Sequence, residues 1–103
     1  MTSALQHPHP TTALRLGSLR KGATAEIVGL DDSAVASALQ PGELERRLIE
    51  MGLVEGAHVE VLHEGFPKRD PIAVRVNDHT VALRRAEADA VLVLVLTTER
   101  RPR

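Results

Sequence analysis

Cysteine, tryptophan and tyrosine are absent from this chain of 103 residues, and Phe66 is its single aromatic residue. Without cysteine, neither a disulfide framework nor a thiolate metal site can form. With one aromatic side chain, the protein cannot build the aromatic walls that hold polyproline peptides, nor a stacking platform for single-stranded nucleic acid. Two large classes of binding module are therefore excluded by composition.

A charge excess is also missing, since 13 basic residues face 14 acidic ones. Nucleic-acid binders usually carry a basic excess, so we expect no nucleic-acid partner. The longest apolar run, residues 90–96, is too short to cross a bilayer, and the N-terminus lacks the profile of a signal peptide. We therefore expect a cytoplasmic protein of one small domain, without direct membrane insertion.

No catalytic constellation is present. The serines stand outside any nucleophile-elbow pattern, and no glycine-rich phosphate loop occurs. His58 and His63 lie five residues apart on one expected strand and should point to opposite faces, which is poor geometry for shared metal ligation. His79 falls on a turn, and His7 and His9 in a polar tail. We expect no enzyme and no cofactor; Fe(II) or another divalent metal stays open, but no ligand cluster supports it.

The clearest local signal is a corner. Leu48 and Met51 belong to one apolar stripe of a helix. Gly52 suits the left-handed residue just past the helix end, and Leu48 and Leu53 are then the hydrophobic pair of a Schellman cap. Gly56 suits the positive-φ position of a type II turn. Helix, stop, turn and strand start are thus predicted within one short segment.

The rest of the pattern predicts a mainly β fold. Apolar residues alternate with polar ones in four short segments and run continuously in a fifth, so strands are expected at 23–30, about 58–61, 72–76, 81–83 and 90–96. A helix is expected over 43–51, a short helical piece over 34–39, a hairpin turn at 77–79 and a helical turn over 84–89. We predict a small five-stranded barrel with one inserted α-helix, with a three-stranded meander plus helix as the alternative. The domain spans 14–97, between a flexible tail at 1–13 and a basic tail at 98–103.

Two sequence motifs occur together in this chain. Met51-Gly52-Leu53 is followed by Gly56, and Leu83-Arg84 is followed by Glu87-Ala88. Further matching positions, in order from residue 16 to residue 96, are Leu16-Gly17-Ser18-Leu19, Gly22, Ile27-Val28, Val59, Val61 and Asp70-Pro71. In this combination the chain resembles the FeoA (ferrous iron transport protein A) family.

The resemblance implies an SH3-like barrel and a non-enzymatic accessory role in bacterial ferrous iron uptake. Members of the family are thought to act on the membrane transporter FeoB, so the expected partner is the cytoplasmic GTPase domain of such a transporter. The chain would then reach the inner membrane only through the transporter. Two departures from the family pattern stand out: Glu55 replaces a common proline, and the connection at 31–42 is longer than usual.

The expected contact surface combines the corner residues Met51, Leu53, Val54 and Glu55 with Arg84. For Met51 and Leu53, core packing is the stronger interpretation, whereas Val54, Glu55 and Arg84 should be exposed. Self-association through the last strand is a further hypothesis. The motif residues expected to serve the fold itself are Leu48, Gly52, Gly56 and Glu87.

A second hypothesis follows from related SH3-like domains, which form the C-terminal part of iron- and manganese-dependent repressors. This chain has no helix-turn-helix portion and no basic excess, so a stand-alone repressor is disfavoured. A metal-sensing or docking domain associated with a metal-dependent transcriptional regulator is the alternative. Metal binding through His58, His63 or His79 would favour it.

Overall fold

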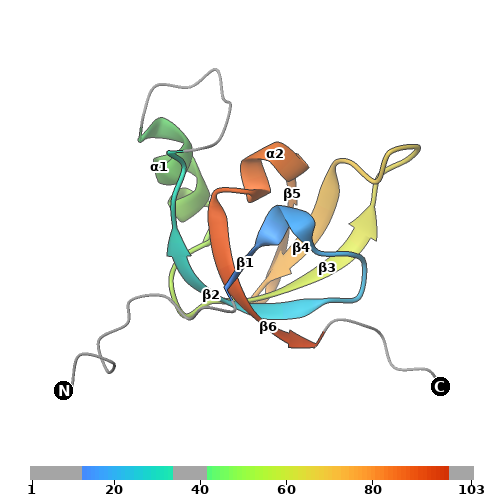
Figure 1. Ribbon diagram of the computed structural model, residues 1–103, viewed down its shortest axis with the longest axis horizontal. Helices are drawn as coiled ribbons and strands as arrows, with labels where there is room; N and C mark the ends of the chain where they lie inside the picture. Colours follow the sequence, from blue (N-terminus) through green and yellow to red (C-terminus); the bar gives the residue numbers. More distant parts are fainter. Residues whose placement is uncertain (1–12, 34–41, 98–103) are drawn as a thin grey trace.

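The computed structural model describes residues 13–33 and 42–97. In chain order its elements are β1 (Leu14–Arg15), the 3-10 turn η2 (Leu16–Ser18), β2 (Thr24–Leu30), α1 (Glu43–Glu50), β3 (His58–Glu64), β4 (Ile72–Val76), β5 (His79–Leu83), α2 (Arg85–Ala88) and β6 (Val91–Thr97). The strands form one antiparallel sheet in the order β1-β6-β2-β3-β4-β5, which curls around the core (Figure 1). The predicted mainly β fold with one α-helix and one helical turn is confirmed.

The sheet has six strands where the sequence predicted five. The additional strand, β1, is two residues long and pairs with β6 through Leu14 and Val93. Two residues are too few to show alternation, so the pattern could not reveal it. In the described residues β1 and β5 end the order of hydrogen-bonded strands, so the curled sheet keeps two edges. The helical piece predicted at 34–39 and both predicted tails beyond 13–97 lie outside the described residues.

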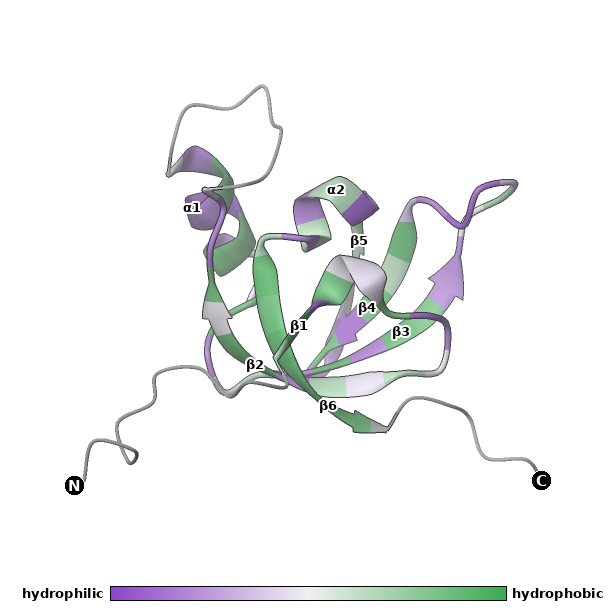
Figure 2. Cartoon of the chain, viewed as in Figure 1, coloured by the Kyte–Doolittle hydropathy of each residue, from purple (hydrophilic) through white to green (hydrophobic). Residues whose placement is uncertain are grey.

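The core is entirely apolar within the described residues. Inward positions alternate along the strands, as in Ala25 and Ile27 of β2 and in Val59 and Val61 of β3. Helix α1 adds Leu44 and Leu48, and β6 is apolar from Val91 to Leu96 (Figure 2). The other large, fully buried side chains are Leu16, Leu53, Ile72, Val74, Val76, Leu83, Val91 and Val93.

Helix α1 ends in the predicted Schellman cap. The backbone N–H of Leu53 donates to the carbonyl oxygen of Leu48 at 3.0 Å, and that of Gly52 donates to Ile49 at 2.9 Å. Gly52 has φ 93°, and the side chains of Leu48 and Leu53 are both fully buried. A β-carbon at Gly52 would also lie 3.0 Å from the ring of His79. The positive φ therefore favours glycine here, and a side chain would also press on the His79 ring.

The turn that follows joins the corner to the sheet. The N–H of Ala57 donates to the carbonyl of Val54 at 3.0 Å, and Gly56 has φ 91°, as the predicted type II turn requires. The N–H of Gly56 donates to Ile27 of β2 at 2.8 Å, and Ile27 returns a bond to Ala57 at 2.9 Å. On the other side, the His79 ring hydrogen-bonds the carbonyl of Met51 at 2.9 Å. The corner is thus fixed to β2 and to β5.

The Arg85 guanidinium links connections that are far apart in the sequence. Its Nη1 donates to the carbonyl oxygens of Gly17 at 3.0 Å and Leu19 at 2.6 Å, and its Nε donates to the carbonyl of Arg69 at 2.7 Å. Its Nη2 pairs with the Glu64 carboxylate at 3.0 Å. Both side chains of this pair are largely buried. The fixed fork of arginine matches these acceptors in a way that lysine cannot.

The same network extends into the backbone around it. The carboxylate of Glu64 also accepts the N–H of Lys21 at 3.1 Å, and that of Asp70 accepts the N–H of Arg85 at 2.9 Å. At the start of α2, Glu87 accepts the N–H of Arg84 at 3.1 Å, which is one half of a capping box. Glu87 therefore serves the fold, as the motif predicted.

We expect Arg85→Lys to lower the free energy of unfolding by about 2 kcal/mol, because an ammonium cannot satisfy the carbonyls and Glu64 together. Arg84→Lys, at the exposed neighbouring position, should change it by less than about 0.5 kcal/mol. Urea unfolding followed by circular dichroism measures both. Equal stability of the two variants would contradict the assigned role of Arg85.

Candidate partner-binding site

A groove lies where α1, the end of β2 and the corner meet. It encloses about 200 Å³ and is lined by Gly29, Leu30, Glu45, Ile49, Val54 and Glu55. We call it the corner groove. Its lining comes from three segments that the Schellman cap and the turn hold in place.

Helical geometry places the groove residues of α1. Leu44 and Leu48 face the core, and Glu45 and Ile49 follow each of them by one residue, four apart on the neighbouring face. Ile49 is 46% exposed although it is a large aliphatic residue. Val54, which also lines the groove, is 39% exposed. Two aliphatic side chains of the groove are therefore partly exposed to solvent.

The described lining of the groove carries charge of one sign. Glu45 and Glu55 are the ionisable residues among the lining residues that the structure describes. Aliphatic side chains beside two carboxylates favour a partner that presents an aliphatic or aromatic side chain next to lysine or arginine. The groove offers contact and charge, and no nucleophile stands among its described lining residues.

The structure separates the predicted contact residues. Val54 and Glu55 line the groove and are exposed, as expected for a contact surface. Leu53 is fully buried, so it has to be removed from that surface: its side chain completes the helix cap. Met51 is half-buried and packs against the core. Arg84 is exposed but does not line the groove.

Sequence reasoning missed Ile49, Glu45 and the β2 end of the groove. Ile49 carried a signal, because an isoleucine outside the Leu44–Leu48–Met51 stripe of a helix should be exposed. The position of Leu30 in the groove had no sequence signal, because it depends on how β2 packs against α1.

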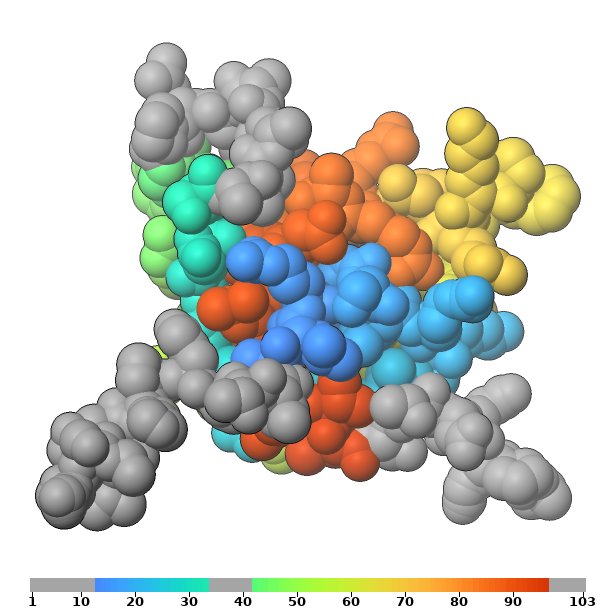
Figure 3. Space-filling model, in the orientation of Figure 1, coloured from blue at the N-terminus to red at the C-terminus, as the bar shows by residue number. Residues whose placement is uncertain are grey.

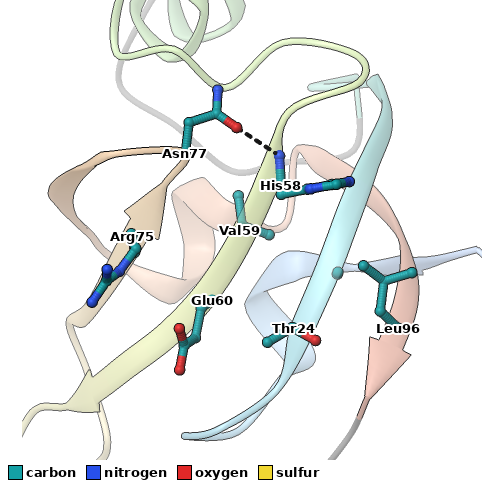
Figure 4. Close-up of a pocket in the computed structure, with 8 residues that line it drawn as sticks. Thr24, His58, Val59, Glu60, Arg75, Asn77 and Leu96 are labelled. Carbon is teal, nitrogen blue, oxygen red and sulfur yellow. Dashed lines mark hydrogen bonds between the residues drawn. The ribbon is translucent and has the colours of Figure 1, made fainter.

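A second hollow of about 260 Å³ lies on the outer face of the sheet and is lined by Thr24, Ala25, His58, Val59, Glu60, Arg75, Asn77 and Leu96 (Figure 4). The Asn77 side chain accepts the N–H of His58 at 3.1 Å. In Figure 4 the His58 ring extends over β2, whereas the Arg75 guanidinium lies over β4. Because the two groups do not converge, this hollow does not present a catalytic arrangement.

The histidines of β3 require a correction. Val61 pairs with Val74, but His63, two residues on, pairs with Ala73, so β3 has a bulge at this point. The bulge returns His63 to the outer face that His58 occupies, and the two do not point to opposite faces as predicted. In the described part of the chain, no three His, Asp or Glu side chains form a group able to hold a metal ion. None of the helices described there is both long and apolar enough to span a membrane.

Comparison with known proteins places this fold. A family model of the FeoA domain matches residues 14–95, nearly the whole of the described sheet and helices. The chain belongs to the FeoA family. FeoA from Stenotrophomonas maltophilia, solved with zinc and described as a procaryotic SH3 domain protein, is 28% identical with a TM-score of 0.67, over 86% of this chain and 99% of that one. The SH3-like fold predicted from the resemblance is therefore confirmed.

Two further relatives matter for function. A fusion of Fe(2+) transport protein A with the Fe(2+) transporter FeoB from Porphyromonas gingivalis is 32% identical over 85 residues; the match takes in 82% of this chain but only 9% of the fusion protein. A manganese-dependent transcriptional repressor bound to manganese has a TM-score of 0.70 at 23% identity, over 86% of this chain and 39% of that one. At this identity the repressor shares the fold alone. The family thus connects the chain with ferrous iron transport.

We expect Leu48→Ala to cost about 2–5 kcal/mol of stability, because it removes a fully buried side chain that completes the cap. Ile49→Ala, one residue along the same helix, should cost less than about 1 kcal/mol, since Ile49 is half exposed. Urea denaturation of both variants measures the difference. Similar losses would show that the groove wall is part of the core.

Proposed function

We propose that this chain is a non-enzymatic accessory protein of ferrous iron uptake, and that it binds the cytoplasmic GTPase domain of a FeoB-type transporter and modulates it. The observation that carries the proposal is the Porphyromonas gingivalis fusion, in which a related sequence and a FeoB transporter occur on one chain. A covalent link keeps two parts of a protein at high effective concentration. Where the parts are separate chains, a binding surface has to replace the link.

The corner groove is the surface we assign to this contact. Ile49 and Val54 provide exposed aliphatic area, and Glu45 and Glu55 provide negative charge beside it. A partner side chain that fills such a groove can act as a binding hot spot. Because the walls are held by the cap and by backbone bonds to Ile27, binding does not have to order them.

Modulation then follows from differential binding. A partner with two nucleotide-dependent conformations shifts toward the one that this chain binds more tightly, by as much as the affinities differ. No chemical step is required of the groove residues, which agrees with a lining of glycine, aliphatic and glutamate side chains. The sign of the effect depends on which nucleotide state has the higher affinity.

We expect saturable binding of the full chain to the purified cytoplasmic domain of the cognate transporter, with affinity that changes with guanine nucleotide. Glu55→Arg should weaken this binding at least tenfold, because the introduced arginine would repel the basic side chains that we expect on the partner. Ile49→Ala should weaken it by about fivefold or more through lost apolar contact. Isothermal titration calorimetry with GDP, with a GTP analogue and without nucleotide gives these affinities.

Asp78→Arg is the matched control, since it reverses an exposed acidic residue on the β4–β5 turn outside the groove. Arg84→Glu tests separately whether the predicted contact surface extends beyond the groove. Equal weakening by Glu55→Arg and Asp78→Arg would show that only net charge matters and would refute the groove. Absence of binding in every nucleotide state, with metal-dependent self-association instead, would favour a role beside a metal-dependent regulator.

A further inference from the structure

The most exposed large apolar side chain of the described residues belongs to the only aromatic residue of the protein. Phe66 is 93% exposed and lies in the loop at 65–71, between β3 and β4. Figure 1 shows this loop projecting from the curled sheet, on the other side of the molecule from α1. Exposure of an aromatic ring to water is unfavourable, and nothing in the fold gains from it.

The loop is closed at its base, so its tip is held outward. The N–H of Gly65 donates to the carbonyl of Pro71 at 2.7 Å, and a β-carbon at Gly65 would lie 2.6 Å from the carbonyl oxygen of Asp70. The carbonyl of Arg69 is fixed by Arg85 at 2.7 Å. Only glycine fits this narrow neck. Phe66 is therefore presented away from the core by a supported loop.

The loop and the segment after η2 carry exposed cations, together with the carboxylates of Glu64 and Asp70, which are half-buried. The exposed cations at this end of the molecule are Arg20, Lys21, Lys68 and Arg69. The two segments are close together, because the Glu64 carboxylate accepts the backbone N–H of Lys21 at 3.1 Å and stands 3.8 Å from Nε of Arg69. That carboxylate is already paired with Arg85 at 3.0 Å. Figure 3 shows the segment after η2 beside the β3–β4 loop.

We propose that residues 66–69, here called the loop tip, form a membrane-contact site that inserts Phe66 into the interfacial region of an anionic bilayer. Lys68 and Arg69, with Arg20 and Lys21 behind them, would bind lipid phosphates. An apolar group set among cations is the combination that holds peripheral proteins at anionic lipid surfaces, where apolar burial and charge attraction add.

Shape favours a bilayer over a protein partner. Phe66 lines neither of the two hollows described above, and it stands on a convex tip. A convex tip needs a surface that yields around it, which a fluid lipid headgroup layer does. A folded protein partner would instead need a pocket of matching shape for the ring.

This inference goes beyond the proposed function and does not rest on it. It departs from the expectation, drawn from the sequence, that the chain has no direct membrane insertion and reaches the membrane only through the transporter. The corner groove and the loop tip are separate surfaces, carried by α1 and by the β3–β4 loop (Figure 1). Contact at the loop tip therefore leaves the groove open to a partner. Weak attachment to the membrane would raise the local concentration of this chain beside any membrane-embedded partner.

The chain contains no tryptophan or tyrosine, so Phe66→Trp gives a fluorophore without background. The full-length variant is mixed with vesicles of phosphatidylglycerol and phosphatidylethanolamine, or of phosphatidylcholine alone. We expect a blue shift of the indole emission, and quenching by brominated acyl chains, with the anionic vesicles only. Val54→Trp places the same fluorophore in the corner groove and should show neither effect. Unshifted and unquenched emission of Phe66→Trp in anionic vesicles would overturn the proposal.

Sedimentation with the same vesicles tests the natural sequence. We expect Phe66→Ala to bind about tenfold more weakly and Lys68→Gln about fivefold more weakly than the unaltered chain. The matched controls, Ile49→Ala and Arg46→Gln on α1, should bind as the unaltered chain does. Unchanged binding of Phe66→Ala would show charge attraction alone and overturn insertion. A blue shift that needs the transporter domain instead of lipid would identify the loop tip as a protein contact.

Discussion

The guanidinium of Arg85 links three connections that lie far apart in the sequence. It fixes the backbone at Gly17 and Leu19 after β1, the end of the β3–β4 loop at Arg69, and the start of α2 in which it lies. Most of these acceptors are main-chain carbonyls, and next to them Leu16 and Leu19 are buried in the core. Glu64 supplies the charge that makes a largely buried guanidinium acceptable. At one end of the sheet, the bonds of Arg85 fix the backbone of the loops in addition to the packing of the apolar core.

The separation in sequence between interacting residues determined which features of the structure could be predicted. The Schellman cap and the type II turn were visible because Leu48, Gly52, Leu53 and Gly56 all lie within nine residues and each has one clear local role. The Arg85 network could not be predicted. Every residue type has a main-chain carbonyl that can accept a hydrogen bond, and Gly17 is 68 residues away from Arg85. The bulge that turns His63 to the outer face could not be predicted either, because it depends on the register between β3 and β4. The exposure of Val54 and Glu55 in the corner groove could be predicted from the corner motif. The contribution of Leu30 from β2 could not be predicted.

The nearly balanced net charge conceals an uneven distribution. Glu45 and Glu55 border the corner groove, whereas Lys68 and Arg69 are exposed in the β3–β4 loop and Arg20 and Lys21 in the neighbouring segment after η2. Two surfaces of opposite sign on one small domain favour partners of different charge, as the two proposals require. Composition alone argued against a nucleic-acid partner, but it could not reveal either surface, because a sum of charges does not describe where they lie.

The geometry of the corner explains why stability and contact can reside in adjacent residues. The cap requires Leu53 to turn inward onto Leu48, and the positive φ of Gly52 sets that direction. The type II turn then begins at Val54, which leaves its side chain outside the core. Exposure of Val54 is thus a consequence of how the helix ends, and the groove wall inherits the rigidity of the cap. If the groove is the contact surface that we propose, binding does not lose affinity to ordering of its walls, because the backbone bonds that stop the helix already hold them.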